Sequence, residues 1–475
     1  MSKKKTILNS IFLCIGLGLL AGCGATDTVS IDLFTANPSD RTAMLDEAEL
    51  DYEVPVTLPG ISVDLYAYDA EASKVAILKG ETLPASFELV KASSGESVYK
   101  GKVKRKDVES DSGLEIATAD FYDFTEPGEY YIKTEILGKS KTFTIEEDAY
   151  ALEFEWARES LKALKCDGCH SAYVSFENDS SKRMDVSGGW HTSEDGSKDV
   201  VEACLAVMDI CTIYEYYPDS FLSLMDEANE EIEWLLKMQN SESGGVYTSV
   251  SLHEDTASGE KTFLIGGETT RATAYFCACM AKFSVTASKL YPDAASLAFQ
   301  AALKAWNCLD ANKEIVTADQ LYRAAVEMYR ATGLTVYNNV ILDYLKENAD
   351  KDYEGRLTLD AAISYLATSR NTNVEYDTVL MANYMSRIQA FNDSAELSAY
   401  GIEEGDYTAD DYLRQAYEFI VADYIMSSSA YRSLEEDYLH YLNGRNADSL
   451  NYTATLITPD SYVKLLALLA GLSTE

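Results

Sequence analysis

The sequence has few histidines, few prolines and too few basic residues to balance its acidic ones. Only four of its 475 residues are histidine and eight are proline. Its 39 lysines and arginines face 78 aspartates and glutamates, which gives a net charge of −39. Such a chain repels phosphate backbones and other acidic polymers, so nucleic acid is excluded as a partner, whereas neutral ligands are not. Nine cysteines in this length are too few for a disulfide framework.

Long hydrophobic runs are also missing, except near the N-terminus. Three lysines at positions 3–5 precede an apolar run over 11–20, which is too short to span a membrane comfortably. Leu20-Ala21-Gly22-Cys23 has the form of a bacterial lipobox. We therefore interpret residues 1–23 as a lipoprotein signal peptide. It predicts an exported protein that a lipid on Cys23, and nothing else, anchors to the outer face of a bacterial membrane. The alternative is an ordinary secretory signal.

Two domains are expected after this signal. Residues 24–58 are polar and acidic without a sustained period, which indicates a tether. Residues 59–147 contain short alternating runs separated by Gly, Ser and Asp, as in an all-β immunoglobulin-like sandwich. The expected strands are Ser62–Tyr66, Lys74–Leu78, Ser86–Val90, Ser97–Val103, Tyr130–Thr134 and Lys141–Ile145. A turn is expected at Thr125-Glu126-Pro127-Gly128.

From residue 148 to 475 the hydrophobic period becomes helical. Leu224, Ala228, Ile232 and Leu235 share one face, for example, whereas Glu227, Glu230, Glu231 and Glu233 fall mostly elsewhere. About twelve such segments are expected, near 149–164, 198–216, 219–239, 268–290, 292–309, 317–332, 335–347, 359–369, 375–390, 409–427, 430–443 and 459–473. Six helical hairpins suit an (α/α)6 barrel, and they could equally stack as an open solenoid.

The stretch from Cys166 to Asp199 combines several chemically versatile residues. Cys166, Cys169, His170 and His191 form a complete tetrahedral zinc set that leaves no water position. Such an ion is structural, because its binding free energy stabilises the loop that it closes. The alternative is a Cys166–Cys169 disulfide beside two ordinary histidines. Five further cysteines fall in helical patterns and are expected to be buried thiols, although a bridge among them stays open: Cys204, Cys211, Cys277, Cys279 and Cys308.

Several motifs resemble those of family 9 glycoside hydrolases. The segments FELVKASSGESVYKGKV (87–103) and DFYDFTEPGEYYIKTEILGKSKTFTI (120–145) are similar to the Ig-like module that precedes many of these enzymes. MDVSGGWHTSEDGSKDVV (184–201) resembles the family's Asp-Val-Ser-Gly-Gly-Trp signature. IEWLLKMQN (232–240) with Gly244-Gly245-Val246-Tyr247, ADQLYRAAVEMYRATG (318–333) and YLNGRNADS (441–449) follow in the family's order.

The resemblance implies an Ig-like domain on an (α/α)6 barrel that cleaves β-1,4-glucans with inversion. It also implies a zinc site whose ligands map onto the four residues named above, with a shorter spacing between the two cysteines than the family usually shows. An inverting enzyme needs a carboxylate base and a carboxylic acid about 6.5–9.5 Å apart. The family's base aligns with Asp195, and its companion aspartate, which helps to hold the water, aligns with Thr192. Glu194 is a neighbour that a rearranged turn could use instead.

The general acid of the family has no clear counterpart. Its place falls near Leu456 to Thr458, and the nearest carboxyl group is that of Asp460. Thr458-Pro459-Asp460 is also an ordinary helix start, with an N-cap, Pro at the first position and an acid in the first turn. We favour that interpretation. Losing a general acid typically costs about 10²–10⁴ in rate.

Three hypotheses for function follow from the sequence. The first is a surface-tethered β-glucanase with Asp195 as base and an unrecognised acid. The second is a non-catalytic lipoprotein that binds β-glucan oligosaccharides in the same cleft, and the third is a structural or protein-binding scaffold. Trp190, beside the expected cleft, is the one aromatic residue assigned to sugar contact. The resemblance assigns no calcium ligands.

Overall fold

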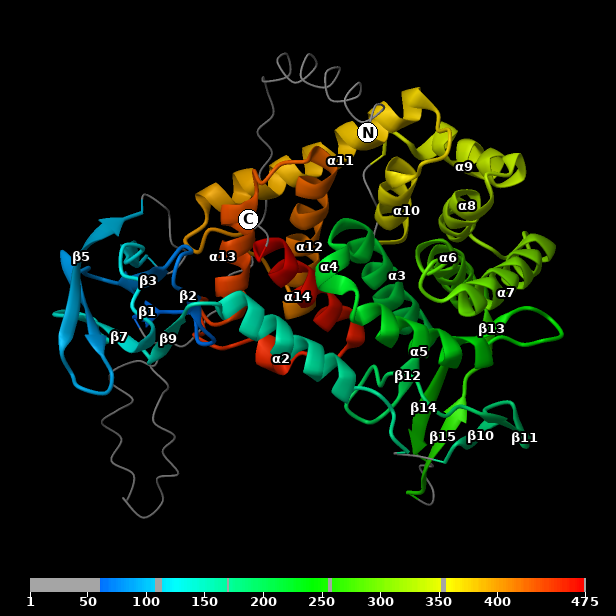
Figure 1. Ribbon diagram of the computed structural model, residues 1–475, viewed down its shortest axis with the longest axis horizontal. Coiled ribbons are helices and arrows are strands. Elements are labelled where there is room, and N and C mark those ends of the chain that lie inside the picture. Colours follow the sequence, from blue (N-terminus) through cyan, green and yellow to red (C-terminus); the bar gives the residue numbers. More distant parts are fainter. Residues whose placement is uncertain (1–59, 107–112, 169–170, 255–258, 352–355, 474–475) are drawn as a thin grey trace. The chain divides into compact units, whose positions relative to one another are not determined.

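The computed structural model describes residues 60–106, 113–168, 171–254, 259–351 and 356–473 (Figure 1). The predicted signal peptide, lipidated Cys23 and tether lie outside these residues. So do Cys169 and His170 of the predicted zinc site. Within the described residues the fold class is confirmed, since a β domain precedes a helical one.

The β domain is built from nine strands among the described residues. They are β1 (Ile61–Ser62), β2 (Tyr68–Asp69), β3 (Val75–Gly80), β4 (Ser86–Lys91), β5 (Ser97–Arg105), β6 (Glu115–Asp120), β7 (Gly128–Thr134), β8 (Gly138–Lys139) and β9 (Phe143–Glu146). The strand order is β1-β3-β6-β5-β4-β7-β9-β2, with β8 paired to β7. Alternate residues of these strands form one apolar core that includes Tyr68, Phe87, Leu89, Phe121 and Ile132.

Several details of the β domain differ from the sequence prediction. Strands β2 and β8 were not predicted, and the turn expected at Thr125-Glu126-Pro127-Gly128 lies instead at Tyr122 and Asp123, while Gly128 already begins β7. Of the predicted strand Ser62–Tyr66 only Ser62 lies in a strand, and the chain bends at Leu65 and Tyr66, where the carboxylate of Asp64 accepts a hydrogen bond from the backbone N of Tyr66 at 2.7 Å. Such an Asx turn competes with strand pairing. Strand β6 was not predicted, although it pairs with β3 over its whole length.

All twelve predicted helical segments are present. The long helices are α2 (Ala149–Ala163), α3 (Val200–Tyr216), α5 (Leu224–Lys237), α6 (Thr270–Thr286), α7 (Pro292–Ala311), α8 (Ala318–Thr332), α9 (Thr335–Asn348), α10 (Arg356–Ala367), α11 (Val374–Leu397), α12 (Ala409–Met426), α13 (Arg432–Leu442) and α14 (Pro459–Leu472). The predicted segment 219–239 divides into a short α4 (Pro218–Phe221) and α5.

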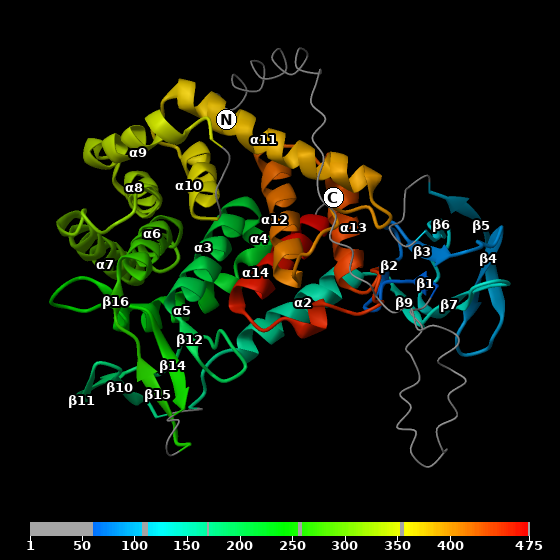
Figure 2. The same cartoon turned by 180° about the vertical axis from the view of Figure 1, so that it is seen from behind.

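The helices form an inner and an outer ring. Nearly every residue of α3 and α14 is buried, whereas α2 buries a single stripe, so α3 and α14 are inner helices and α2 is an outer one. Helix α3 packs against both α6 and α14. The first and last inner helices therefore meet, which decides for a closed barrel and against an open solenoid. Figure 1 and its reverse view in Figure 2 both show α12 and α14 lying between α2 and α11.

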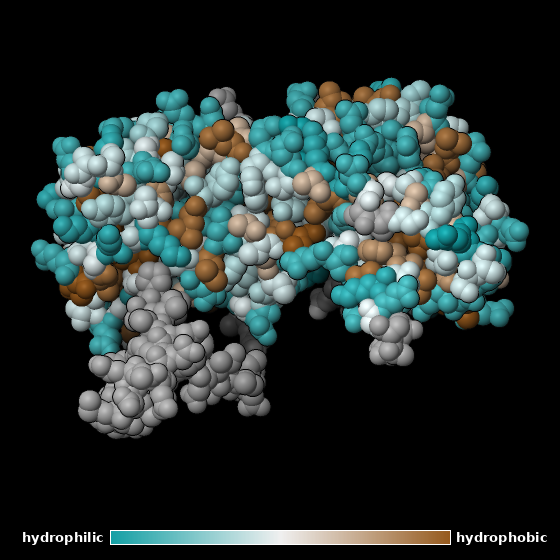
Figure 3. Space-filling view, turned by 90° about the horizontal axis from the view of Figure 1, so that it is seen from below, coloured by the Kyte–Doolittle hydropathy of each residue, from teal (hydrophilic) through white to brown (hydrophobic). Residues whose placement is uncertain are grey.

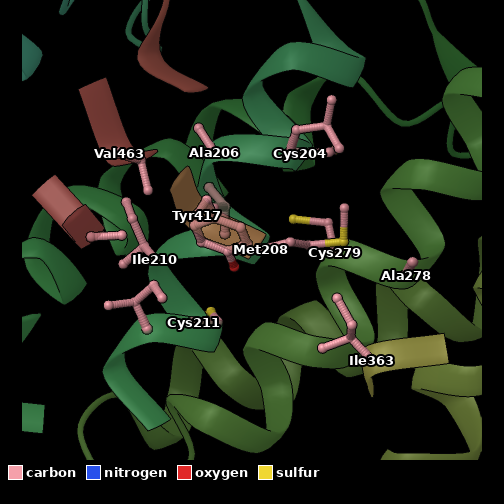
Figure 4. Close-up of a cluster of buried hydrophobic side chains, with 14 of the residues drawn as sticks. Cys204, Ala206, Met208, Ile210, Cys211, Ala278, Cys279, Ile363, Tyr417 and Val463 are labelled. Atoms are coloured by element: carbon pink, nitrogen blue, oxygen red, sulfur yellow. The ribbon is translucent and has the colours of Figure 1, made fainter. Parts of the chain in front are cut away.

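The interior of the barrel contains a cluster of apolar side chains that includes free thiols. Figure 4 shows Met208 of α3 next to Cys279 of α6, with Cys204 and Cys211 of α3 and Tyr417 of α12 around them. Cys204, Cys211, Cys277 and Cys279 are buried and not in disulfides, as predicted for them, whereas Cys308 is only half-buried, so its predicted burial is wrong.

Short strands accompany the barrel and were not predicted. They are β10 (Tyr173–Phe176), β11 (Asp179–Asp185), β12 (Lys198–Asp199), β13 (Val246–Tyr247), β14 (Ser249–Glu254), β15 (Lys261–Ile265) and β16 (Glu268–Thr269). Five of them form the sheet β11-β10-β15-β14-β12. This sheet leads the chain into α3 and thereby fixes the loop that precedes that helix.

Hydrophobic residues on the surface are scattered. The face in Figure 3 shows them mainly as separate patches between hydrophilic residues. Within the described ranges, no helix combines the length and the apolar character that a membrane crossing requires.

Candidate active site

The candidate site is the loop between β11 and α3, at the end of the barrel where the inner helices begin. Because the chain alternates between the two rings, successive inner helices run in the same direction. The loop before α3 and the start of α14 are therefore at the same end. Helix α3 begins at Val200 and is capped by Asp199, whose side chain accepts hydrogen bonds from the backbone N of Val201 and Glu202.

Two glycines shape the first half of this loop. Gly188 and Gly189 have φ values of 81° and 76°, which side chains other than glycine rarely adopt. A Cβ on Gly189 would lie 2.5 Å from Cγ of Trp234 on α5. Both the backbone conformation and the lack of space therefore require glycine at position 189.

The loop is tied down from two sides. Nζ of Lys198, which is fully buried, donates to the carbonyl oxygens of Val186 at 2.9 Å and Gly188 at 2.5 Å. From α5, Nζ of Lys237 donates to the carbonyl oxygen of Ser187 at 2.8 Å, and Glu231 accepts from the backbone N of Trp190 at 2.9 Å. Burial raises the pKa of Glu231 to about 8, even though the Trp190 N–H and the nearby Lys198 lower it.

Asp195 lies at the exposed tip of the loop. Its Oδ1 accepts hydrogen bonds from Oγ of Ser193 at 2.6 Å and from the backbone N of Ser197 at 2.9 Å. These hydrogen bonds lower the pKa of Asp195 below its ordinary value. Asp195 is therefore a fixed, ionised carboxylate that water can reach. Its low pKa makes it a weaker proton acceptor than an unperturbed carboxylate.

Thr192 closes the turn that carries Asp195. Its Oγ1 donates to the carbonyl oxygen of Ser197 at 3.3 Å and accepts from the backbone N of Asp199 at 3.0 Å, and its backbone N also bonds the Ser197 carbonyl. The donor and one acceptor position of the hydroxyl are thus used inside the loop. Glu194 is exposed beside Asp195.

The expected sugar contact of Trp190 is wrong. Its side chain is 1 % exposed and belongs to the main apolar core of the helical domain. A ring that stacks on a sugar must offer a face to solvent. The aromatic side chain of the Gly-Gly-Trp turn serves to fasten the loop to the barrel.

Asp460 has the contacts of a residue at a helix start. Thr458 caps α14 by accepting from the backbone N of Ser461, and Pro459 occupies the first turn, as predicted. The carboxylate of Asp460 pairs with Nζ of Lys464 at 2.5 Å, and the same ammonium pairs with the buried Asp209 of α3 at 3.2 Å. These contacts join the last inner helix to the first. The role of Asp460 as an acid stays a prediction.

Two of the four predicted zinc ligands can be located. An antiparallel bridge joins Lys165 to Trp190, with hydrogen bonds from the backbone N of Cys166 to Gly189 O at 2.9 Å and from the backbone N of His191 to Leu164 O at 2.8 Å. Since side chains alternate along extended backbone, Cys166 and His191 lie on the same side of this bridge, diagonally opposite each other. Within the described residues no cluster of three metal-ligating side chains occurs, and the other two predicted ligands are not among them. The zinc site is therefore untested.

Sequence reasoning missed the residues that support the loop. Glu231 was placed off the apolar face of its helix, but it is buried at 2 % exposure. Its position three residues after Ala228 and four before Leu235, both fully buried, was the available signal.

The motif at 318–333 has a structural task. Its Glu327 is fully buried and pairs with Arg323 at 3.4 Å, Arg330 at 3.2 Å and Lys282 of α6 at 3.7 Å. Burial alone would raise the pKa of Glu327, but the three cations lower it to about 2. Arg330 also bonds both oxygens of Glu215 on α3, at 3.0 and 2.9 Å. This ion cluster connects three inner helices.

Comparison with known families agrees with the two-domain organisation. Residues 140–458 match the model of glycosyl hydrolase family 9, and residues 57–139 match the cellulase N-terminal ig-like domain. Among curated proteins, endoglucanase D of Acetivibrio thermocellus is 27 % identical over 192 residues, which are 34 % of this chain and 30 % of that protein. A xyloglucan-specific endo-β-1,4-glucanase of Bacteroides ovatus is 25 % identical over 223 residues, 39 % of this chain and 38 % of the relative. The matches thus span about a third of the length of these relatives.

Solved structures share the fold. A single mutant of a thermostable endoglucanase from Alicyclobacillus acidocaldarius superposes with a TM-score of 0.70 at 22 % identity, covering 83 % of this chain and 84 % of the other. A Zn-binding triple mutant of a family 9 endoglucanase gives a TM-score of 0.68 at 22 % identity, covering 80 % of this chain and 82 % of that one.

Proposed function

Because the chain belongs to glycosyl hydrolase family 9, we propose that it is a cell-surface lipoprotein that hydrolyses a β-1,4-glucan, with Asp195 as the catalytic base. The observation that carries this proposal is the exposed, ionised carboxylate of Asp195 on a loop that two lysines and α5 hold rigid. The names of the relatives, endoglucanase and xyloglucan-specific endo-β-1,4-glucanase, support a β-glucan as substrate.

The reaction is an inverting hydrolysis. Asp195 takes a proton from a water molecule as the water oxygen bonds to the anomeric carbon, and the glycosidic carbon–oxygen bond breaks on the opposite face. The departing oxygen takes a proton from an acid, for which Asp460 is the nearest carboxyl group to the family position. Thr192 supplies no second negative charge beside the water, and the low pKa of Asp195 weakens the base. We therefore expect slow turnover.

A second function is supported by the same residues. With threonine in place of the companion aspartate and with Asp460 committed to Lys464, the loop could hold a glucan without cleaving it. A non-catalytic β-glucan-binding lipoprotein is the alternative that these contacts favour.

The test compares Asp195→Ala with a matched control. Asp179 in the neighbouring hairpin makes the same kind of turn, since its Oδ1 accepts from Oγ and the backbone N of Ser181. If the glucanase proposal holds, wild type and Asp179→Ala release reducing sugar from soluble xyloglucan or hydroxyethylcellulose. Asp195→Ala should lose about 10²-fold or more in kcat. Oligosaccharide binding without turnover in wild type would instead support the binding function.

We also propose a structural zinc ion held by Cys166, Cys169, His170 and His191. The bridge that places Cys166 and His191 on one side of the backbone supports it. Two thiolates and two imidazoles give a closed tetrahedral site, so the ion would stabilise the loop rather than activate water. Metal analysis should find about one zinc per chain in wild type and in Cys308→Ala, and much less in Cys166→Ala. Equal zinc content in all three would contradict the site.

The anchor on Cys23 is proposed from the lipobox alone. Expressed from its full-length gene in a bacterium, the protein should partition into detergent-extracted membranes and carry fatty acid, whereas Cys23→Ala should do neither. Release of the wild-type protein into the medium would indicate an ordinary secretory signal.

A further inference from the structure

We propose that Glu231 is a positioning residue that holds the loop of Asp195 in its working conformation through the backbone N–H of Trp190. This inference rests on the proposed function, because it gives that function's base its support. Glu231 itself does not reach the reacting atoms, since it is buried behind Trp190.

Helix α5 supports three points of the loop in order. Lys237 bonds Ser187, Trp234 packs against Gly189, and Glu231 bonds Trp190. Residues 231, 234 and 237 are spaced by three, so they share one face of α5. In both Figure 1 and Figure 2, α5 lies beside β12, the strand that ends the loop.

The link from Trp190 to Asp195 is short and stiff. His191 is fixed by its backbone hydrogen bond to Leu164, and Thr192 is bonded to Ser197 through both its backbone N and its hydroxyl. The turn that carries Asp195 is therefore one hydrogen-bonded unit attached to Trp190. A shift of Trp190 displaces this unit as a whole, and small displacements of a catalytic group have large effects on rate.

Glu231 interacts with this loop in particular. In the described part of the chain, its Oε2 accepts from Trp190, whereas Oε1 is buried and has no hydrogen-bond partner. The charges that act on it are Lys198 from the loop end and Lys165 from the bridge, and its own charge acts on the thiol of Cys279 of α6. A buried carboxyl group that only filled space would lower the free energy of unfolding, because it loses its hydration and an apolar side chain would fill the same space.

The side chain can be replaced by a close mimic. With its pKa raised to about 8 by burial, Glu231 is mostly protonated at pH 7 and carries no charge. Glutamine has the same shape and keeps a carbonyl oxygen that can accept from the Trp190 N–H. Rescue by glutamine therefore separates loss of the hydrogen bond from loss of a carboxyl group.

The experiment compares Glu231→Ala, Glu231→Gln and Glu233→Ala in the whole mature protein. Glu233 is exposed on the same helix and serves as the control. Amide hydrogen exchange is followed in residues 186–198 and in α3. Glu231→Ala should raise exchange in 186–198 about tenfold and leave α3 unchanged, because a buried acceptor for one N–H is lost. Glu231→Gln and the control should stay within about twofold of wild type.

Kinetics on xyloglucan form the second readout. Glu231→Ala should lower kcat about tenfold with KM changed less than about twofold, and Glu231→Gln should restore kcat. The inference is overturned if exchange rises equally in α3, if 186–198 does not change, or if glutamine behaves as alanine does. Should Glu231→Ala fail to fold, Glu231→Leu replaces it, since leucine fills the space without an acceptor.

The two proposals fail in different ways. A wild-type protein without turnover on any β-1,4-glucan removes the glucanase function, and hydrogen exchange alone then decides whether Glu231 positions the loop. Suppose instead that Glu231→Ala speeds exchange in the loop but leaves turnover unchanged. Glu231 then does not position Asp195 for catalysis, and the glucanase function remains supported.

Discussion

Two motifs of the helical domain that resemble the family, 185–199 and 441–449, differ in what their residues do. Each contains a glycine at positive φ pressed against a core side chain: Gly189 against Trp234 and Gly444 against Leu65. Each is also bonded by a buried glutamate of an outer helix, Glu231 of α5 and Glu153 of α2. The exposed carboxylates of the two motifs differ in their partners: Asp195 accepts hydrogen bonds within its own turn, whereas Asp448 accepts one from the hydroxyl of Tyr452 at 2.6 Å.

Most residues of the second motif are buried and have structural contacts. Asn443, Arg445 and Asn446 are at most 1 % exposed. Nδ2 of Asn443 donates to Glu153 at 3.0 Å and to Asp64 of the β domain at 3.4 Å. His440 shares Asp64 through a 2.7 Å contact. Family-like sequence in this stretch therefore maintains a buried junction, whereas in 185–199 it maintains an exposed carboxylate. The presence of a family motif does not by itself indicate catalysis.

The largest loss of stability is expected when the buried hydrogen bonds of Asn443 are removed. These bonds form the junction between the second motif, α2 and the β domain. Asn443→Ala takes the amide donor away from the buried Glu153 and removes one partner each from Asp64 and from Thr453, whose Oγ1 donates to Asn443 Oδ1 at 2.9 Å. We expect the free energy of unfolding to fall by about 3 kcal/mol or more. Hydrogen exchange in 186–198 should not change more than in α3. Urea unfolding followed by circular dichroism measures the first quantity.

Asn392 gives the control for this prediction. Its side chain bonds the exposed Glu396 at 3.4 Å, with no other hydrogen bond to the described residues, so Asn392→Ala should cost about 0.5 kcal/mol or less. If Asn443→Ala lowers the free energy of unfolding by less than about 1 kcal/mol, the hydrogen bonds of Asn443 contribute little to stability. The second motif would then not be the structural element that we describe.

Hydrophobic periodicity was sufficient to predict the helices, but not the residues that hold the loop of Asp195 in place. The twelve helices follow from a period that depends on each segment alone. The strands β10 to β16 were missed because they are short and, as in Asp179–Asp185, mostly polar. Glu231 was missed because its burial depends on the loop that packs over α5. Trp190 was misassigned for the same reason, since sequence cannot tell a core tryptophan from one that faces a cleft.

The second prediction concerns pH and the carboxyl group beneath the loop. The folded protein keeps the proton of Glu231 up to a pH of about 8, whereas the unfolded chain releases it near the ordinary pKa of 4.5. The folded state thus binds more protons between these values, so this contribution to stability is complete below pH 4.5 and is lost as pH rises toward 8. Glu231→Gln removes it.

Stability at two pH values measures this effect. Between pH 5 and pH 7.5, wild type should lose about 3 kcal/mol more unfolding free energy than Glu231→Gln does. The buried glutamate of the second motif should behave in the same way, because burial and the charge of Asp64 raise the pKa of Glu153 well above its ordinary value. Glu153→Gln should also flatten the pH dependence. Parallel curves for wild type and Glu231→Gln would show that Glu231 is already ionised at pH 5.

The smallest effect is expected for Lys237, at the edge of the same loop. Its ammonium group bonds Oγ of Ser187 at 3.0 Å as well as the carbonyl oxygen, pairs with Asp185 at 3.2 Å and is one-third exposed. Lys237→Met keeps the apolar stem and removes these contacts, so local opening should become easier by about 1 kcal/mol, which is about fivefold faster exchange in 186–190. Lys182→Met removes a well-exposed ammonium that pairs with Asp179 at 3.6 Å, and should change exchange less than twofold. If both variants behave alike, α5 supports the loop through Glu231 and Trp234 only. The support of the first motif would then consist of one hydrogen bond and one packed ring, compared with the several buried hydrogen bonds of Asn443 in the second motif.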